Sequence, residues 1–372
     1  MISNSDYEEK LIKQQQQEIQ DKNFLIDIAI GYTKSIALSI ALKYKIPQLL
    51  EEKSKSCKEL SNILNVNCDY LYRLMRSLST IGVFIEDELE DGVFRNSRLS
   101  KLLTNSNSDS WVNNVYLQSH PNVIQSFMYL EKSIECGISQ GMTSQGFTSA
   151  WELFEKDKQL KTHFHNTMTC FTSEEIKTIL KYIDFNQYKT IVDLGGSSGE
   201  LLKSIAKSSR GELVESFINF DLPLVINQNK TSYGPATINN NNNKDGADEI
   251  DSRYSEVASD FFGDSEYPRA DCYTLKFIFH MFNDDKVLTI LEKISKSIKP
   301  NGKVYVFDHI VQPKNEPSAP FYFDLQMVLN FNGRERSKNE WRSVFEKSSF
   351  KIDTILILSD SKRMSVIELS LK

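Results

Sequence analysis

Several kinds of residue and segment are scarce in this chain of 372 residues. Its five cysteines are scattered, none forms a CxxC pair, and none lies in a Cys/His array with zinc spacing, which excludes a zinc site built on cysteine. No apolar run approaches the roughly 20 residues of a membrane span, and the N-terminal residues are too polar for a signal peptide. We therefore predict a cytoplasmic protein with reduced thiols and no membrane partner.

Basic residues are not in excess either. The chain carries 44 Lys and Arg against 50 Asp and Glu, a formal net charge of -6. Proteins that bind nucleic acid usually have a clear basic excess, so this balance argues against a nucleic-acid partner. The composition, with 40% hydrophobic and 25% charged residues, is that of an ordinary globular protein. The length predicts two domains.

The N-terminal third predicts a small helical domain behind a polar tail. Residues 1–22 are rich in glutamine and charge and are predicted to be disordered or a solvated helix. Residues 23–115 predict short helices followed by a β-hairpin that turns at Asp91 and Gly92, which is a winged-helix pattern. Acids crowd the hairpin and would repel phosphate. We therefore expect this domain to bind protein, and a winged-helix transcription regulator remains only as an alternative.

Residues 116–372 predict the catalytic domain. From Lys189 onward, short apolar runs alternate with helical segments, which is typical of parallel strands buried on both faces. The chain closes with two strands joined by "SDSKR", which predicts an antiparallel edge hairpin. The predicted fold class is thus α/β, a doubly wound, Rossmann-like sheet. Five consecutive asparagines within 237–252 predict a loop insertion without catalytic residues.

A glycine-rich turn follows the first predicted strand, in "TIVDLGGSSGELL" at 190–202. Gly195, Gly196 and Gly199 permit a tight turn and a close approach of backbone N–H groups to a ligand. The dinucleotide motif GxGxxG is not matched, because Ser197 stands where that motif has its second glycine. The loop therefore predicts a cofactor site of another kind.

Two acids beside this loop indicate which cofactor it binds. Asp193, two residues before Gly195, would repel a pyrophosphate and suit an amino group. Asp221, at the end of the second predicted strand, stands where a ribose diol is usually hydrogen-bonded. Together they predict an adenosine-type cofactor without phosphates. S-adenosylmethionine fits, because it has a ribose, an amino group and a sulfonium cation.

From about Ile30 to the end, the sequence resembles the plant-type, S-adenosylmethionine-dependent small-molecule O-methyltransferases, such as the caffeate, flavonoid and hydroxyindole enzymes. We find the family's "VDVGGGTG" as "VDLGGSSG", its "FDLP" unchanged, and its "MKWILHDWSDE" as "LKFIFHMFNDD". Further similarity lies in "SDFF", "NGKVYVFDHIV" and "NGRERSKNEW". The resemblance implies methyl transfer from S-adenosylmethionine to a small phenol of secondary metabolism, with S-adenosylhomocysteine as product and without a metal. It also implies a homodimer formed by the N-terminal domain.

The resemblance also implies roles for single residues. His280 falls on the catalytic base, and Asp308 and Glu335 fall on the two acids that flank it. The positions implied to contact the cofactor, besides Asp193, Gly196 and Gly199 of the loop, are Gly195, Asp221, Asp260, Phe261 and Lys276. The positions implied to lie near the substrate are Met168, Met327 and Asn330.

Three positions depart from the family pattern. Ser197 replaces the middle glycine of the loop, a change that a turn can tolerate. Asp308 is one methylene shorter than the usual Glu, so its reach to His280 is open, and the sequence does not decide which acid pairs with the histidine. Met281 replaces the acid that usually follows the base, which predicts an apolar, substrate-lining face and an altered choice of substrate.

The predicted reaction needs a base to deprotonate the phenol, because the methyl group on the sulfonium is already activated. A phenol has a pKa near 10, like tyrosine, and is mostly protonated at neutral pH. A histidine, with an ordinary pKa of about 6.5, can remove that proton as attack develops. Two alternatives remain open: a non-catalytic relative that binds S-adenosylmethionine, and an N-methyltransferase of a small aromatic amine.

Overall fold

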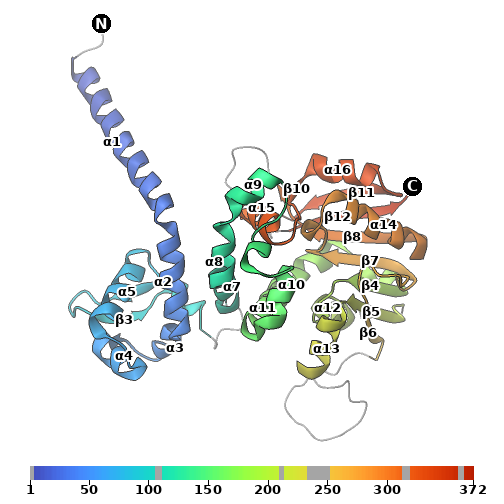
Figure 1. Ribbon diagram of the computed structural model, residues 1–372, viewed down its shortest axis with the longest axis horizontal. Helices are drawn as coiled ribbons and strands as arrows, with labels where there is room; N and C mark the ends of the chain where they lie inside the picture. The colour runs from blue at the N-terminus through green and yellow to red at the C-terminus, as the bar shows by residue number, and fades with distance from the viewer. Residues whose placement is uncertain (1–3, 105–110, 209–212, 233–251, 312–318, 359–363) are drawn as a thin grey trace, which may run out of the picture. The chain divides into compact units, whose positions relative to one another are not determined.

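The computed structural model of the chain divides into two compact units, Met1–Pro121 and Asn122–Lys372 (Figure 1). It describes the whole sequence except residues 1–3, 105–110, 209–212, 233–251, 312–318 and 359–363. The asparagine-rich segment predicted as a loop insertion, 237–252, therefore lies outside the described residues apart from Ser252.

The N-terminal unit combines helices with a small antiparallel sheet. Its helices are α1 (Asn4–Ala29), α2 (Gly31–Lys43), α3 (Ile46–Leu49), α4 (Cys57–Leu64), α5 (Cys68–Thr80), α6 (Arg98–Lys101) and α7 (Val112–Gln118). Its strands, in the order β1-β3-β2, are β1 (Lys55–Ser56), β3 (Val93–Asn96) and β2 (Phe84–Glu86). The antiparallel pair β2–β3 confirms the predicted hairpin, and Gly92 takes the left-handed conformation in its turn, with φ 77°.

The helix at the start of the chain is exposed over most of its length. The residues predicted as a disordered tail or a solvated helix are helical from Asn4 onward, as part of α1. In the part of the chain that the structure describes, no single helix is long and apolar enough to cross a membrane. Residues 10–29 and 31–43, bent by 48° where they meet, pass that test only as a pair, on length and composition.

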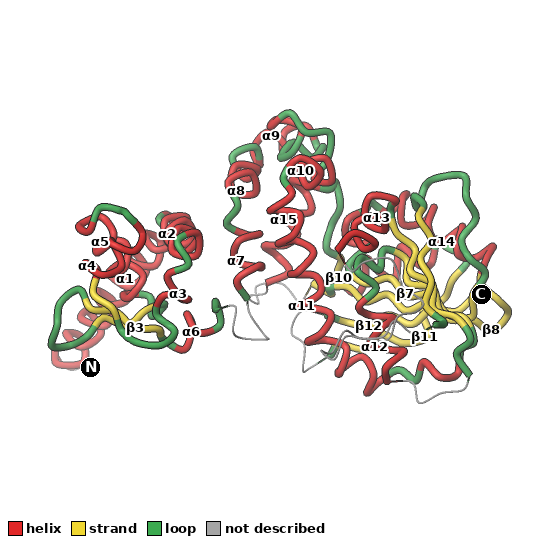
Figure 2. Tube along the Cα trace, turned by 90° about the horizontal axis from the view of Figure 1, so that it is seen from below, coloured by secondary structure: helices red, strands yellow, loops and turns green. Residues whose placement is uncertain are grey.

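The C-terminal unit is organised by one sheet, seven-stranded in the described residues (Figure 2). Its order is β11-β12-β8-β7-β4-β5-β6, with β4 to β8 pairing in parallel and β12 antiparallel to both neighbours. The strands are β4 (Thr190–Leu194), β5 (Ser216–Asp221), β6 (Tyr254–Ala258), β7 (Ala270–Lys276), β8 (Ile298–Asp308), β11 (Phe350–Ile357) and β12 (Ser365–Leu371). The predicted α/β class and its edge hairpin are confirmed.

The C-terminal unit also contains several α-helices. They are α8 (Pro121–Phe127), α9 (Leu130–Cys136), α10 (Ala150–Lys156), α11 (Lys158–Tyr182), α12 (Glu200–Ser208), α13 (Pro223–Ser232), α14 (Asp284–Ser297), α15 (Ala319–Asn330) and α16 (Lys338–Glu346). Short 3-10 helices are η1 (Thr143–Gln145), η2 (Phe185–Gln187) and η3 (Phe279–Met281). Two short parallel strands, β9 (Ile310–Val311) and β10 (Arg336–Ser337), form a separate ribbon.

Apolar side chains on successive strand residues fill both faces of the sheet, because neighbouring residues of a strand point to opposite sides. Val192 of β4 packs in the core with helices α14 and α16. Its neighbour Ile191 packs in the core with α11 and α12. Both faces are therefore covered, and the carboxyl edge of the parallel strands is left as the place for a ligand site.

Candidate active site

The turn after β7 presents a buried histidine at the carboxyl edge of the sheet. Lys276 ends the strand, Phe277 takes the left-handed conformation with φ 54°, and η3 then places His280 in the interior. Asn283 accepts a hydrogen bond from the backbone N–H of Lys286 at 3.1 Å and so caps α14. Capping of α14 therefore accounts for the presence of Asn283 in this turn, but it does not account for the buried His280.

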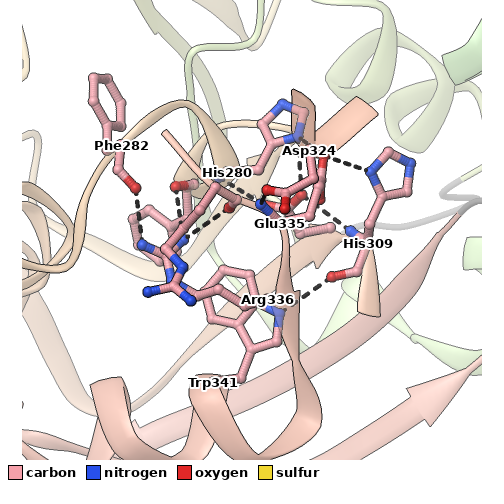
Figure 3. Close-up of polar contacts among 10 residues, drawn as sticks. His280, Phe282, His309, Asp324, Glu335, Arg336 and Trp341 are labelled. Atoms are coloured by element: carbon pink, nitrogen blue, oxygen red, sulfur yellow. Dashed lines mark hydrogen bonds and ion pairs between the residues drawn. The ribbon is translucent and has the colours of Figure 1, made fainter. Parts of the chain in front are cut away.

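Glu335 holds the imidazole of His280, as Figure 3 shows. Nδ1 of His280 lies 2.8 Å from Oε1 of Glu335. Nδ1 of His309 lies 3.0 Å from the same oxygen. Burial raises the pKa of Glu335, but the two histidines outweigh burial and lower it to about 2. Because an ionised carboxylate can only accept hydrogen bonds, both imidazoles carry a proton on Nδ1, and Nε2 is the basic atom of each neutral ring.

The carboxylate of Asp308 binds different groups from that of Glu335. Its Oδ1 lies 3.5 Å from Nδ1 of His280, too far for a good hydrogen bond. Its two oxygens instead accept the backbone N–H groups of His280, at 3.1 Å, and of His309, at 3.0 Å. Burial raises the pKa of this carboxyl. The pairing that the sequence left open is thus decided: Glu335 orients the ring, and Asp308 fixes the two backbones.

The electrostatic surroundings make His280 a strong base. Burial lowers the pKa of His280, but the carboxylates of Asp308 and Glu335 more than offset burial and raise it to about 9. Such an imidazole is mostly protonated at neutral pH. Only a small fraction of the rings is then neutral and able to accept a proton, and a positive charge nearby would enlarge that fraction by lowering the pKa.

Arg336, which our sequence reasoning missed, fastens the segment that carries Glu335. Its side chain is fully buried and donates to the carbonyl oxygens of Phe279 at 3.1 Å and of Phe282 at 2.8 Å. It also donates to Oδ1 of Asp284 at 2.8 Å. The segment is thereby tied to η3 and to the start of α14. A buried arginine has no sequence signature, because the sequence does not distinguish it from an arginine on the surface.

His309 was also missed, although a signal was present. It directly follows Asp308 at the carboxyl end of a buried strand, and the chain has only five histidines. The parallel pairing of β9 with β10 sets Ile310 opposite Arg336 and so brings Glu335 beside His309.

Close backbone packing also fixes this segment. The backbone N–H of Arg334 donates to the carbonyl oxygen of His280 at 2.8 Å. A Cβ added to Gly333 would lie 2.2 Å from that same oxygen and 2.5 Å from the carbonyl carbon of Met281. Only glycine allows this approach between the segment and η3.

The loop between β4 and α12 is tightly wound, as its glycines predict. Gly195 and Gly199 take the left-handed conformation, with φ 77° and 76°. A Cβ on Gly199 would lie 2.0 Å from the hydroxyl of Tyr254. Ser197, which replaces a family glycine, also lies in this region at φ 53°, and its N–H donates to Oδ2 of Asp221 at 2.8 Å. The turn therefore accommodates the serine, and Asp221 helps to hold the loop.

Asp193 is the buried acid of the loop. Its side chain accepts a hydrogen bond from the hydroxyl of Thr274 at 2.7 Å, and burial raises its pKa to about 7. A Cβ on Gly196 would lie 2.5 Å from Oδ2 of Asp193, so this carboxylate lies directly against the loop. Burial also raises the pKa of Asp221, to about 6. Both acids can change charge in the neutral range.

The remaining predicted cofactor positions lie around the same edge. Nζ of Lys276 forms a buried ion pair with Oε2 of Glu175, on α11, at 2.9 Å. The ring of Phe261 stacks on Phe220 with centroids 6.1 Å apart. Asp260 accepts a backbone N–H two residues further on, at 2.8 Å. Glu175 was not predicted, because nothing in a helix sequence shows that one of its acids is buried.

The predicted substrate-lining residues are spread over three elements. Met168 lies on α11 and Met281 in η3, while Met327 and Asn330 lie on α15. Met327 is buried and the other three are partly buried. Oδ1 of Asn330 is buried and has no hydrogen-bond partner among the described residues. That these four side chains line one pocket stays a prediction.

A doubly wound sheet with an antiparallel edge hairpin, a glycine loop after its first strand and a histidine–acid cluster at its carboxyl edge define the class of α/β methyltransferases. The chain belongs to the O-methyltransferase family: the model of the O-methyltransferase domain matches residues 127–351. The model of the O-methyltransferase dimerisation domain matches residues 26–106. The family predicted from the sequence is confirmed.

Individual proteins show the same relationship. The chain is 84% identical over 372 residues to Des-methyl DIF-1 methyltransferase A of Dictyostelium discoideum, with 100% of both chains covered. The solved structure of mitomycin 7-O-methyltransferase is similar, with a TM-score of 0.82 and 25% identity, covering 96% of this chain and 100% of that one. Human N-acetylserotonin methyltransferase in complex with S-adenosylmethionine shares the fold, with a TM-score of 0.81, 18% identity and coverage of 95% and 98%.

Proposed function

We propose that the protein moves the methyl group of S-adenosylmethionine to a phenolic hydroxyl of a small aromatic metabolite, with His280 as the general base. The observation that carries this proposal is the 2.8 Å contact of His280 Nδ1 with Glu335, which fixes the ring with Nε2 as its reactive atom. The family match and the 84% identity to a methyltransferase support the reaction type.

The residues around the glycine loop fit this cofactor. Asp193 is buried against the loop and suits the amino group of the ligand. The carboxylate oxygens of Asp221 each accept one backbone N–H and keep a lone pair for the ribose hydroxyls. Phe261, held by stacking on Phe220, suits the adenine. When bound, the sulfonium supplies the activated methyl group.

The chain's own part in the reaction is to position and deprotonate the acceptor. Nε2 of His280 would accept the phenolic proton, and Glu335 and Asp308 would stabilise the imidazolium that forms. Without a cation nearby, the pKa of His280 is raised to about 9. A cation in the cofactor site would lower this pKa and favour the neutral imidazole, because like charges disfavour protonation, and loss of that charge on methyl transfer would favour proton uptake at Nε2.

The test is methyl transfer from labelled S-adenosylmethionine to a panel of small phenols and aromatic amines, with cofactor binding measured in parallel. The first compound of the panel is des-methyl DIF-1, after which the 84% identical relative is named. Methylation of a phenol supports the proposal. Methylation of amines alone would move the assignment to nitrogen, and tight cofactor binding without any transfer would favour a non-catalytic binding protein.

We also propose a homodimer formed through the N-terminal unit. The dimerisation-domain match at residues 26–106 supports it. So does a set of exposed apolar side chains on α1 and at the start of α2, since such surfaces are usually covered by a partner. These side chains are Phe24, Leu25, Ile26, Ile28, Ile30 and Tyr32. Light scattering at several protein concentrations distinguishes the dimer from a monomer.

The affinity for S-adenosylhomocysteine is expected to rise as the pH rises through about 7, because Asp193 then ionises and pairs with the amino group of the ligand. Asp193→Asn should weaken binding by roughly tenfold, as expected for the loss of a charge-assisted hydrogen bond. Calorimetry between pH 5.5 and 8.5 measures both effects. The dependence that remains in the variant should centre on Asp221, whose pKa is about 6.

A matched control is Asp271→Asn. Asp271 lies near the opposite end of β7, where it pairs with Lys299 at 3.0 Å. This variant should keep the pH dependence of the unaltered protein. Binding that is flat with pH in the unaltered protein would contradict the role of Asp193.

A further inference from the structure

The histidine–acid cluster contains a second buried imidazole that the proposed mechanism does not use. His280, Asp308, His309 and Glu335 each bring one nitrogen or oxygen atom to within 4.8 Å of the others. The side chain of His309 is 7% exposed and that of His280 is 11% exposed. Both rings use Nδ1 to contact Oε1 of Glu335, at 3.0 and 2.8 Å. The other oxygen, Oε2, is buried and has no hydrogen-bond partner among the described residues.

His309 is held firmly in this position. Its ring stacks on Phe323 of α15, with centroids 5.6 Å apart and planes 6° apart. It also packs against Phe277, with centroids 5.0 Å apart. Its backbone N–H donates to Asp308 at 3.0 Å, and its carbonyl accepts from the indole N–H of Trp341 at 3.2 Å. The ring is therefore fixed by its neighbours independently of Glu335, and can act as an anchor for that carboxylate.

We propose that His309 is a positioning residue that holds the Glu335 carboxylate in place and takes up part of its charge, and thereby sets how strongly His280 holds its proton. This inference rests on the proposed role of His280 as the base. Figure 3 shows the arrangement on which it stands, with both imidazoles directed at Glu335 from different elements.

The sign of the effect follows from the groups that face the cluster. They are Asp308 from the end of β8, Glu335 from the segment before β10, and Asp324 of α15, which accepts the backbone N–H of Glu335 at 2.7 Å. Without the N–H donor of His309, the negative charge of Glu335 is no longer partly neutralised and interacts in full with His280. His280 should then keep its proton to higher pH. The sign is the same whether His309 donates as a neutral ring or as a cation.

The test is a histidine-selective ¹⁵N NMR titration of the full-length protein, which is practical because the chain has five histidines. His309→Phe keeps an aromatic ring between Phe277 and Phe323 but removes the N–H donor. The His280 midpoint should move up by roughly 0.5 to 1 pH unit, the size expected for one hydrogen bond. His309→Asn restores an N–H donor and should bring the midpoint back toward that of the unaltered protein.

A second background tests whether the effect passes through Glu335. In a Glu335→Gln protein, His309→Phe should cause no further shift, because contacting residues that act through a shared partner are not additive. If His309→Phe shifts the His280 midpoint equally in the Glu335→Gln protein, the proposal is overturned. It is also overturned if His309→Phe leaves the His280 midpoint unchanged in the protein that keeps Glu335.

Phe323→Leu is the matched control. It removes the stacked ring but leaves Phe277, the backbone hydrogen bonds and the hydrogen bond to Glu335, so it should shift the midpoint much less than His309→Phe does. A shift equal to that of His309→Phe would assign the effect to packing and overturn the proposal. If His309→Phe does not fold, the comparison of His309→Asn with His309→Leu replaces it. Because the titration needs no turnover, a failed phenol assay and a failed role for His309 are seen separately.

Discussion

Replacing His280 with alanine is expected to lower turnover by about two to four orders of magnitude, the usual contribution of a positioned general base. The affinity for S-adenosylhomocysteine, which has no sulfonium charge, should change little, because the imidazole contacts Glu335 and not the glycine loop. At saturating S-adenosylmethionine, kcat/KM for the phenol should rise with pH and level off below about 9, because the base must be neutral to accept a proton and the cation of the cofactor lowers its pKa. The variant should lose this rise. Steady-state kinetics across pH and calorimetry of cofactor binding measure these quantities.

Asn283→Ser is the matched control for this turn. It lies three residues along, and serine keeps the hydrogen bond that caps α14. Turnover in this variant should stay close to that of the unaltered protein. Undiminished activity in His280→Ala would show that His280 is not the base. The measured cofactor binding would not be affected by that result.

Replacing Gly333 with alanine is expected to damage stability and catalysis together. The added Cβ would lie 2.2 Å from the carbonyl oxygen of His280, and backbone on both sides must move to relieve the contact. Overpacking of this kind costs roughly 1–3 kcal/mol in the free energy of unfolding. The movement separates Glu335 from His280, and a misplacement of about 1 Å can lower turnover by roughly a hundredfold. Urea denaturation and kinetics measure the two effects.

Gly263→Ala provides the comparison for the Gly333 variant. A Cβ there would lie 3.5 Å from the nearest atom, the carbonyl oxygen of Asp260, which is an ordinary contact. Stability and turnover should both stay close to those of the unaltered protein. If Gly333→Ala behaves in the same way, the close packing of this segment does not position Glu335.

The sequence was informative where the physical cause is local. Strand and helix periodicities extend over a few residues, and they predicted the edge hairpin, the parallel strands and the hairpin of the N-terminal unit. The glycine loop was predictable because left-handed backbone at Gly195 and Gly199 is nearly a property of the residue type. The family resemblance then pointed to His280, Asp308 and Glu335.

Only the tertiary structure decided how these residues are paired. His280 and Glu335 are 55 residues apart in sequence, and Glu335 and His309 are 26 apart, so their contact depends on the pairing of β9 with β10. The choice of Glu335 over Asp308 as the ring partner rests on a difference between 2.8 and 3.5 Å. No local pattern encodes such a distance.

The same limit applies to the residues that sequence reasoning missed. Arg336 and Glu175 are charged side chains whose burial depends on partners brought in from other elements. The sequence by itself determined the family and the fold class, and it predicted His280 as the base. The fold decided that two imidazoles share one carboxylate oxygen, because only packed strands and helices bring distant polar groups within hydrogen-bond distance and exclude water from around them.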